Sequence, residues 1–351
     1  MLKRDYKIIV VGAGDFSIYE KALYNAFLAL GYSRTELILS NDYYNIDNPL
    51  LYFFSKVEFR YGKGLQTTSF NKSLVEICRL KKPDIVFLYT CRMVLPKTVL
   101  KLKKMGIYIA SYCNDDPFSR KYRKSFWRNY RDALKYCNIN YVYRESNIKD
   151  VEKCTGRAGS LLRSYYIEEQ NYPCEKNEII SDVPDVIFLG HIEADERLDY
   201  LETLLDKGVK IGLNRDAYHD WAKGKDGIVF LEKPRDLYNN YLCSCKIPLV
   251  FLSKLNRDTY TRRCFEIPAA KAFLLCPYTE DLASMFTENK EIIFYRTKED
   301  FVKKVLFYIN HDSEREKIAR AGYERVIKDG HEIKDRAKTI IQDYERVAFE
   351  K

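Results

Sequence analysis

Residues 7–14 read Lys-Ile-Ile-Val-Val-Gly-Ala-Gly, and this stretch decides the fold class. An apolar, mostly β-branched run that ends at a glycine turn is typical of a strand buried on both faces of a parallel sheet. Ser17 and Glu20 then have the spacing of a capping box at the start of a helix, and Gly31 is placed to end that helix. Between them, apolar residues recur at helical spacing, at Ile18, Ala22, Leu23, Ala26, Phe27 and Leu30. Strand, glycine turn and helix in this order predict the first repeat of a doubly wound α/β domain.

The same alternation runs through the chain in two series. Further strands of the first series are expected at 36–39, 57–60, 84–89, 107–112 and 140–143. The second series starts at Asp185-Val-Ile-Phe-Leu-Gly190 and continues at 209–213, 227–231, 247–252, 272–276 and 291–295. Segments with helical periodicity separate the strands in both series. The sequence therefore predicts two Rossmann-like, doubly wound domains whose strand ends face a cleft.

A polar segment with Pro173 and Pro184 separates the two series. We expect an N-terminal domain at 1–168, a linker at 169–184 and a C-terminal domain at 185–331. The final segment, 332–351, is expected to form a helix that packs on the N-terminal domain. Its apolar face contains Ile333, Ala337, Ile340, Ile341, Tyr344 and Val347.

Composition narrows the class of protein. The 351 residues are 46% hydrophobic, which is ordinary for a globular protein, and no stretch approaches the ~20 apolar residues that a membrane-spanning helix needs. The chain runs into its first strand without an apolar signal region, and its ten cysteines are scattered, so we expect a cytoplasmic protein with reduced thiols. The formal net charge of +9 favours an anionic partner.

Three motifs, in order along the chain, resemble one group of known proteins. Residues 253–269 read Ser-Lys-Leu-Asn-Arg-Asp-Thr-Tyr-Thr-Arg-Arg-Cys-Phe-Glu-Ile-Pro-Ala, and residues 114–117 read Asn-Asp-Asp-Pro. Near the end of the chain stand Ala319, Gly322, His331 and Arg336. The set resembles the spore-maturation-type (CgeB-like) branch of GT-B glycosyltransferases. The resemblance implies a GT-B fold and the transfer of a sugar from a nucleotide-sugar donor.

Within the second domain the resemblance and the residue types point to a donor site. Arg263 and Glu266 stand three apart and share a helix face, so the carboxylate can accept ribose hydroxyls while the arginine neutralises diphosphate charge. A solvated, charged helix start is the alternative interpretation. Lys271 stands where the resembled branch usually has glycine, and a positive φ there would cost ~1 kcal/mol. The full set of expected donor-binding residues is Gly190, His191, Lys254, Asn256, Arg257, Asp258, Tyr260, Arg263 and Glu266.

The first domain is expected to receive the acceptor and to supply the catalytic base. Asp116, Asp115 and Asp15 follow predicted strands, and a carboxylate with a raised pKa can deprotonate an acceptor hydroxyl. A turn before Pro117 is the simpler interpretation of the aspartate pair. Gly12, Gly14 and Arg144 are the expected contacts to acceptor or phosphate groups.

The segment 120–135 combines seven basic residues with Tyr122, Phe126, Trp127 and Tyr130. Contact with anionic lipid, binding of an acidic acceptor, and a solvated helix are all compatible with this pattern.

The function predicted from the sequence is glycosyl transfer from a nucleotide sugar to a glycan, lipid-linked or protein acceptor, without a metal or other cofactor. A peripheral contact with an anionic membrane is compatible with this function, and no nucleic-acid partner is expected. Two alternatives stay open. A nucleotide-sugar epimerase can share the fold, and a non-enzymatic nucleic-acid binder would account for the net charge.

Overall fold

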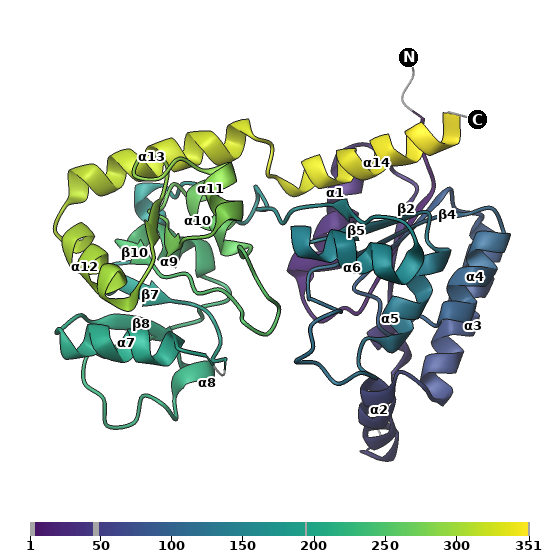
Figure 1. Cartoon of the computed structure of the whole chain (residues 1–351), viewed down its shortest axis with the longest axis horizontal. Helices are drawn as coiled ribbons and strands as arrows, with labels where there is room; N and C mark the ends of the chain where they lie inside the picture. Colours follow the sequence, from purple (N-terminus) through teal and green to yellow (C-terminus); the bar gives the residue numbers. More distant parts are fainter. Residues whose placement is uncertain (1–3, 45–48, 194, 350–351) are drawn as a thin grey trace. The chain divides into compact units, whose positions relative to one another are not determined.

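Figure 1 shows the computed structural model, which describes residues 4–44, 49–193 and 195–349. The chain divides into two compact units. Unit 1 contains Met1–Ser164 and Ile333–Lys351, and unit 2 contains Tyr165–Glu332.

Unit 1 is built on a six-stranded sheet in the order β2-β1-β3-β4-β5-β6, in which every neighbouring pair is parallel. The strands are β1 (Ile8–Gly12), β2 (Thr35–Leu39), β3 (Ile85–Tyr89), β4 (Tyr108–Cys113), β5 (Ile139–Val142) and β6 (Ser160–Leu161). The central strands β1, β3 and β4 are buried along their whole length, as expected for apolar runs covered on both faces.

Helices connect and cover these strands. A π-helical turn (Ser17–Lys21) leads into α1 (Ala22–Ala29), followed by α2 (Pro49–Tyr61), α3 (Leu65–Lys81), α4 (Pro96–Lys104), α5 (Arg128–Ala133) and α6 (Glu145–Thr155). The last helix of the chain, α14 (Ile333–Phe349), lies in unit 1 and packs on α1. It buries Ile333, Ala337, Ile340 and Ile341, four residues of its apolar face.

Unit 2 has a parallel four-stranded sheet in the order β10-β7-β8-β9 and a parallel pair, β11-β12. The strands are β7 (Val186–Phe188), β8 (Ile211–Asn214), β9 (Ile228–Leu231), β10 (Ile247–Pro248), β11 (Leu275–Pro277) and β12 (Ile293–Tyr295). A bridge between Leu249 and Leu275 continues the sheet from β10 to β11. The helices are α7 (Arg197–Asp206), α8 (Arg215–Tyr218), α9 (Tyr238–Ser244), α10 (Arg263–Ala269), α11 (Glu280–Met285), α12 (Lys298–Ile309) and α13 (Asp312–Lys328).

The predicted fold class is confirmed, because both units are parallel sheets connected by helices. The prediction of a strand at 57–60 is wrong, since these residues belong to α2. The capping box at Ser17 and Glu20 does not form either. Glu20 is buried instead, and its carboxylate accepts a hydrogen bond from the Gly14 amide.

Residues 169–184, expected as a linker, belong to unit 2 in the structure. Asn239 on α9 holds this segment, because its amide nitrogen donates to the Tyr172 carbonyl (2.9 Å) and its side-chain oxygen accepts from the Tyr172 amide (3.3 Å). Among the residues that the structure describes, no helix combines the length and the apolar character that crossing a bilayer requires.

Candidate active site

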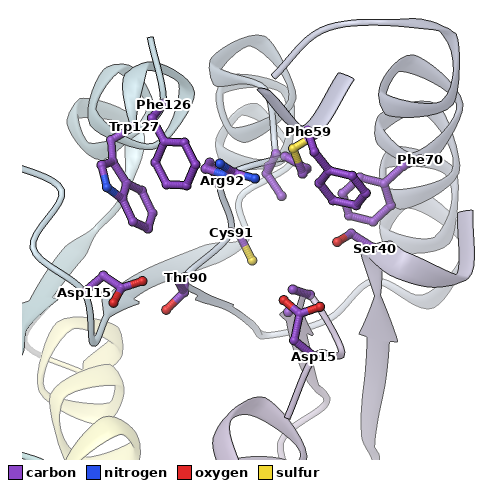
Figure 2. A pocket seen from close by; sticks show the side chains of 14 residues that line it. Asp15, Ser40, Phe59, Phe70, Thr90, Cys91, Arg92, Asp115, Phe126 and Trp127 are labelled. Carbon is purple, nitrogen blue, oxygen red and sulfur yellow. The ribbon is translucent and has the colours of Figure 1, made fainter. Parts of the chain in front are cut away.

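Unit 1 contains a pocket of about 360 Å³ at the carboxyl ends of its central strands (Figure 2). Its lining comes from the loop after β1 (Gly12, Ala13, Asp15), from residues 90–94 after β3 and from Asp115 after β4. Aromatic rings complete it, with Phe59 from α2, Phe70 from α3, and Phe126 and Trp127 from the turn before α5. Carboxyl ends of parallel strands are the usual ligand site of such sheets.

Two of the three expected base residues line this pocket. Figure 2 shows the carboxylates of Asp15 and Asp115 on opposite sides, with Thr90 and Cys91 between them. Asp15 accepts a hydrogen bond from the Asn41 amide group (2.8 Å). The third candidate, Asp116, is fully buried and does not line the pocket.

The carboxylate of Asp116 has a structural role in the turn that follows β4. It accepts hydrogen bonds from the Phe118 amide and from the Asn147 side chain, both at 3.0 Å. These bonds hold the turn and tie it to α6. The pocket therefore favours Asp15 and Asp115 as the candidate bases.

Arg92 is a pocket residue that the sequence did not single out. Its guanidinium lies 3.7 Å from the centre of the Phe126 ring, and its Nη1 is buried with no hydrogen-bond partner among the described residues. Burial lowers the pKa of Arg92, and the nearby charges of Asp15 and Asp115 oppose that shift. A buried donor of this kind is suited to an oxygen of a bound ligand.

Thr90 holds a strained backbone conformation at the end of β3. Its φ of 49° lies in the left-handed region, which is unfavourable for a β-branched residue. The Tyr112 carbonyl accepts from its amide (2.7 Å), and the Asn114 side chain accepts from its hydroxyl (2.8 Å). Strain that the surroundings enforce in this way is typical of functional sites.

The glycine loop after β1 does not present its amides as expected. Gly14 donates its N–H to Glu20, so this group is engaged within the protein. A Cβ at Gly12 would lie 2.3 Å from Cγ of Glu20, which explains why this position needs glycine. Burial raises the pKa of Glu20, and the charge of Asp15 adds to that shift. Arg144 is 1% exposed, lies over the Tyr143 ring and does not line the pocket.

The aromatic residues of segment 120–135 serve the interior of unit 1. Trp127 and Tyr130 are buried, and Tyr122 and Phe126 pack against the same cluster. Phe126 and Trp127 also line the pocket. These four rings therefore do not form an exposed surface.

Unit 2 has a pocket of about 620 Å³, also at the carboxyl ends of its strands. Three expected donor residues line it, namely Lys254, Arg257 and Asp258. Arg197, Tyr278 and Arg296 add to the lining, so four of its residues carry a positive charge. Arg257 has a φ of 53°, a second strained non-glycine residue at a pocket.

The loop after β7 is fixed by a network around Glu193. Its carboxylate lies 3.3 Å from His191 Nε2 and accepts a hydrogen bond from the Ser253 hydroxyl (2.8 Å). Burial alone raises the pKa of Glu193, but the hydrogen bonds from His191 and Ser253 and the charge of Arg197 outweigh it and lower the pKa to about 2. The His191 ring itself is largely exposed.

Arg197 supports the same loop from the start of α7. Its guanidinium makes a two-bond contact to Asp195 (2.7 and 2.6 Å) and donates to the His191 carbonyl (2.7 Å). Gly190 is required in this loop because a Cβ there would lie 2.3 Å from the Phe188 ring.

Arg263 and Glu266 both lie on α10 but contact different elements. Arg263 Nη2 donates to the Leu189 carbonyl (2.9 Å), while Glu266 accepts from the Tyr238 hydroxyl (3.0 Å) and pairs with Arg262 (2.7 Å). Arg263 Nε is buried and finds no hydrogen-bond partner in the described part of the chain. The buried Tyr218 hydroxyl likewise has no hydrogen-bond partner among the described residues. Burial raises the pKa of Tyr218, and the nearby charges of Arg197 and Arg263 oppose that shift.

The remaining expected donor residues have other placements. Tyr260 is fully buried and packs edge-on against Phe265, so it belongs to the core of unit 2. The amide of Asn256 donates to the Ser253 hydroxyl (3.3 Å), and Asn256 does not line the pocket. Lys271 has a φ of 56°, which is the positive value that the glycine comparison suggested.

The second half of the chain matches a known family model. Residues 202–342, most of unit 2 and the first part of α14, match the model described as glycosyl transferase-like. No curated protein matches the chain in sequence.

Solved structures resemble the chain over almost its whole length. The sucrose-phosphate synthase of Thermosynechococcus elongatus is 10% identical, covers 98% of this chain and 100% of its own, and superposes with a TM-score of 0.71. Anabaena HepE in complex with UDP and glucose is 9% identical over 96% and 99% of the chains, with a TM-score of 0.68. A putative UDP-N-acetylglucosamine 2-epimerase of Listeria monocytogenes is 12% identical over 99% and 98%, with a lower TM-score of 0.56. At such identities the structures establish the fold.

The fold is that of these structures, and residues 202–342 match a glycosyl transferase-like model, so both observations indicate an enzyme of the GT-B glycosyltransferase type.

Proposed function

We propose that this GT-B glycosyltransferase moves a sugar from a uridine diphosphate sugar to a hydroxyl of a carbohydrate acceptor, without a metal cofactor. Unit 2 binds the donor, and unit 1 binds the acceptor and supplies the base. Structures similar to this chain include Anabaena HepE in complex with UDP-glucose, which supports a uridine nucleotide as the donor.

The observation that carries the donor assignment is the state of Arg263. One nitrogen of its guanidinium is fixed by the Leu189 carbonyl, and its Nε is buried without a hydrogen-bond partner among the described residues. A fixed, partly unsatisfied guanidinium is suited to the oxygens of a diphosphate, whose charge grows as the nucleotide leaves. The buried Tyr218 hydroxyl is a second donor in this neighbourhood.

Glu266 takes the ribose in this proposal. One of its oxygens accepts from Tyr238 and the other pairs with Arg262, which fixes the carboxylate and leaves lone pairs for hydroxyl donors. Lys254, Arg257 and Asp258 line the neighbouring pocket and contribute charge and hydrogen bonds to the donor.

The acceptor is proposed to bind in the pocket of unit 1. Carboxylates that accept hydroxyl protons, together with aromatic rings in the lining, suit a sugar ring. Asp115 or Asp15 removes the proton of the acceptor hydroxyl, whose oxygen attacks the anomeric carbon of the donor. The bond from that carbon to the diphosphate oxygen breaks, and UDP leaves with the electron pair. Direct attack of this kind inverts the configuration at the anomeric carbon.

We also propose a branch of the superfamily and a cellular location. The motif Arg263-Cys-Phe-Glu-Ile-Pro-Ala269 supports the CgeB-like branch, and a nucleotide-sugar donor agrees with a cytoplasmic location.

The test of the donor site is a thermal-shift series with UDP and UDP-sugars on the wild type and on Arg263→Ala. A ligand at 100 times its Kd stabilises by ~2.7 kcal/mol, so we expect a clear upward shift of the unfolding temperature for the wild type and little or none for the variant. Arg320→Ala, an exposed arginine on α13, serves as the control and keeps the shift. A shift retained in Arg263→Ala contradicts the assignment, and no shift with any uridine nucleotide contradicts the donor.

The base is tested by single-turnover transfer with Asp115→Asn and Asp15→Asn. The variant that removes the base is expected to slow transfer by about 10²–10⁴-fold while the donor-induced thermal shift stays intact. Asp116→Asn tests the structural role instead, and it is expected to lower the unfolding temperature.

An epimerase is the second candidate, supported by the resemblance to the Listeria protein. Incubation with UDP-N-acetylglucosamine alone separates the two. Conversion to an epimer without any acceptor favours the epimerase, and transfer that requires an acceptor favours the glycosyltransferase.

A further inference from the structure

Helix α2 and the first residue of α3 expose an unusual number of large apolar side chains. Phe53 is 60% exposed and Leu65 is 87% exposed, and four more residues of the same stretch are exposed, namely Tyr52, Phe54, Val57 and Tyr61. Single exposed apolar residues are ordinary on protein surfaces, whereas a contiguous group marks an interaction site. These six residues are called the aromatic face of α2 below.

Polar side chains make much of the contact between this helix and unit 1. Ser55 and Glu58 are buried, and the Glu58 carboxylate accepts hydrogen bonds from the backbone amides of Gln66 (3.1 Å) and Thr67 (2.7 Å). The Thr67 hydroxyl donates to the same carboxylate (2.8 Å). A surface helix normally buries its apolar stripe, whereas α2 buries Ser55 and Glu58 beside the inward-facing Phe59 and exposes most of its described aromatic residues. Because Glu58 binds the first turn of α3, this orientation is fixed by the fold.

The exposed charged residues of α2 are all basic. Lys56 lies 4.3 Å from the centre of the Tyr52 ring, and Arg60 lies 5.8 Å from that of Tyr61. Lys63 follows in the turn. Between residues 52 and 65 the only acidic residue is Glu58, which is 6% exposed. The aromatic face is therefore accompanied by positive charge alone.

We propose that the aromatic face of α2 docks onto an anionic lipid bilayer. Phe53, Val57 and Tyr61 stand four residues apart and so share one side of the helix, where they can enter the boundary between headgroups and acyl chains. Lys56, Arg60 and Lys63 contact the negative headgroups. Tyrosine and lysine are suited to this boundary because both combine an apolar stem or ring with a polar end.

The proposal stands independently of the reaction, but it has a consequence for the acceptor that rests on the proposed function. Phe59, on the inward side of α2, lines the pocket of unit 1 and packs on Tyr44 with ring centres 4.5 Å apart. Docking through α2 therefore brings the acceptor pocket to the membrane surface, which suits a glycan carried on a lipid.

The test is flotation of the full chain with vesicles of phosphatidylglycerol and phosphatidylcholine, compared with vesicles of phosphatidylcholine alone. We expect the wild type to bind the anionic vesicles and to bind less as salt rises. Phe53→Ser/Phe54→Ser and Lys56→Glu/Arg60→Glu should each weaken binding by about tenfold or more, since one basic residue near the surface is worth about a fivefold change. Leu80→Ser is the apolar control, because Leu80 is 72% exposed on α3 of the same unit. Lys101→Glu/Lys104→Glu on α4 is the matched charge control.

Wild-type protein that ignores anionic vesicles overturns the proposal, and so does equal loss of binding in the control variants. A concentration-dependent dimer that disappears in Phe53→Ser/Phe54→Ser, without vesicle binding, assigns the face to a second copy of the chain instead. The unfolding temperature of each variant verifies the fold, and Phe54→Ser alone replaces the double variant if that one unfolds. Because vesicle binding needs no substrate, failure here leaves the thermal-shift test of the donor site unaffected.

Discussion

Each unit places a glycine loop directly after its first strand, but the two loops are held by carboxyl groups in opposite states. In unit 1 the loop after β1 rests on Glu20, which is buried and whose pKa is raised by that burial. In unit 2 the loop after β7 rests on Glu193, whose pKa is lowered to about 2 by His191, Ser253 and Arg197. One loop is thus supported by a carboxyl group whose ionisation burial opposes, and the other by a carboxylate that neighbouring groups stabilise.

The difference between the two pKa shifts follows from the charged side chains near each carboxyl group. Arg197 stands within 3.3 Å of Glu193, while the charge that acts on Glu20 is the negative one of Asp15. A loop held by a permanent ion pair keeps its geometry over a wide pH range, and a loop held by a lone buried carboxyl does not. The loop of unit 2, on the proposed donor side, is therefore the more rigidly specified one.

Removing Arg197 is expected to have the largest effect. Arg197→Ala leaves Asp195 buried without its partner and removes the compensating charge from Glu193, so we expect a loss of about 3–5 kcal/mol in unfolding free energy. Calorimetric or urea unfolding measures it. Lys298→Ala, which breaks the exposed pair with Asp199, should cost at most about 1 kcal/mol. Similar losses in both variants would show that the network around Glu193 contributes no more than a surface pair.

Adding one methyl group to either loop tests how closely it is packed. Gly190→Ala drives a Cβ into the Phe188 ring, and Gly12→Ala drives one into the side chain of Glu20. Overpacking of this kind typically costs about 1–3 kcal/mol. Unfolding measurements on double variants separate the two contacts. Phe188→Leu should relieve Gly190→Ala, and Glu20→Ala, which removes Cγ and Cδ but leaves Cβ at 2.7 Å, should relieve Gly12→Ala in part. Purely additive effects would contradict the clash as the cause.

The pH dependence of stability separates the two carboxyl groups by sign. The folded pKa of Glu20 is raised above its ordinary value of 4.5, so its contribution is present below pH 4.5 and is lost as pH rises through the folded pKa. The folded pKa of Glu193 is lowered, so its contribution is present above pH 4.5 and is lost as pH falls towards about 2.

Urea unfolding of Glu20→Gln and Glu193→Gln across this range measures both effects. Relative to the wild type, Glu20→Gln should gain stability as pH rises above 4.5. Glu193→Gln should be less stable at neutral pH, with a deficit that shrinks below pH 4.5. Parallel curves for the two variants would remove the proposed distinction between the loops.

The sequence predicted the sheets because their strands are apolar runs bounded by glycine, a local pattern that survives in the fold. Glu20 makes a contact that the local sequence pattern does not predict. Its spacing from Ser17 predicts a cap, but the carboxyl group of Glu20 packs beside Gly12 and accepts a hydrogen bond from the Gly14 amide. Arg92 was missed because it lies outside any motif. Its place directly after the buried strand β3 is the signal that could have marked it.

The sequence of segment 57–60 predicts a strand for a physical reason. Aromatic and β-branched residues favour strands when they are half-buried, yet here Val57 is exposed on a helix and Phe59 packs inward from it. Bonds from α2 to the start of α3, made by Glu58 and Ser55, hold the helix, and they are tertiary.

The smallest expected effect concerns two helix ends with the same left-handed conformation and different residues. In unit 1 α6 ends at Gly156 with a φ of 74°, and in unit 2 α10 ends before Lys271 with a φ of 56°. Hydrogen bonds from Lys271 to Pro268 and from Ala272 to Ile267 complete the usual turn after α10. Lys271→Gly should therefore stabilise the protein by about 1 kcal/mol, and Gly156→Ala should destabilise it by a similar amount. Thermal unfolding measures both. If Lys271→Gly also changes the UDP-induced shift of the unfolding temperature, Lys271 contributes to the donor site. If that shift is unchanged, Lys271 only lowers the stability of unit 2.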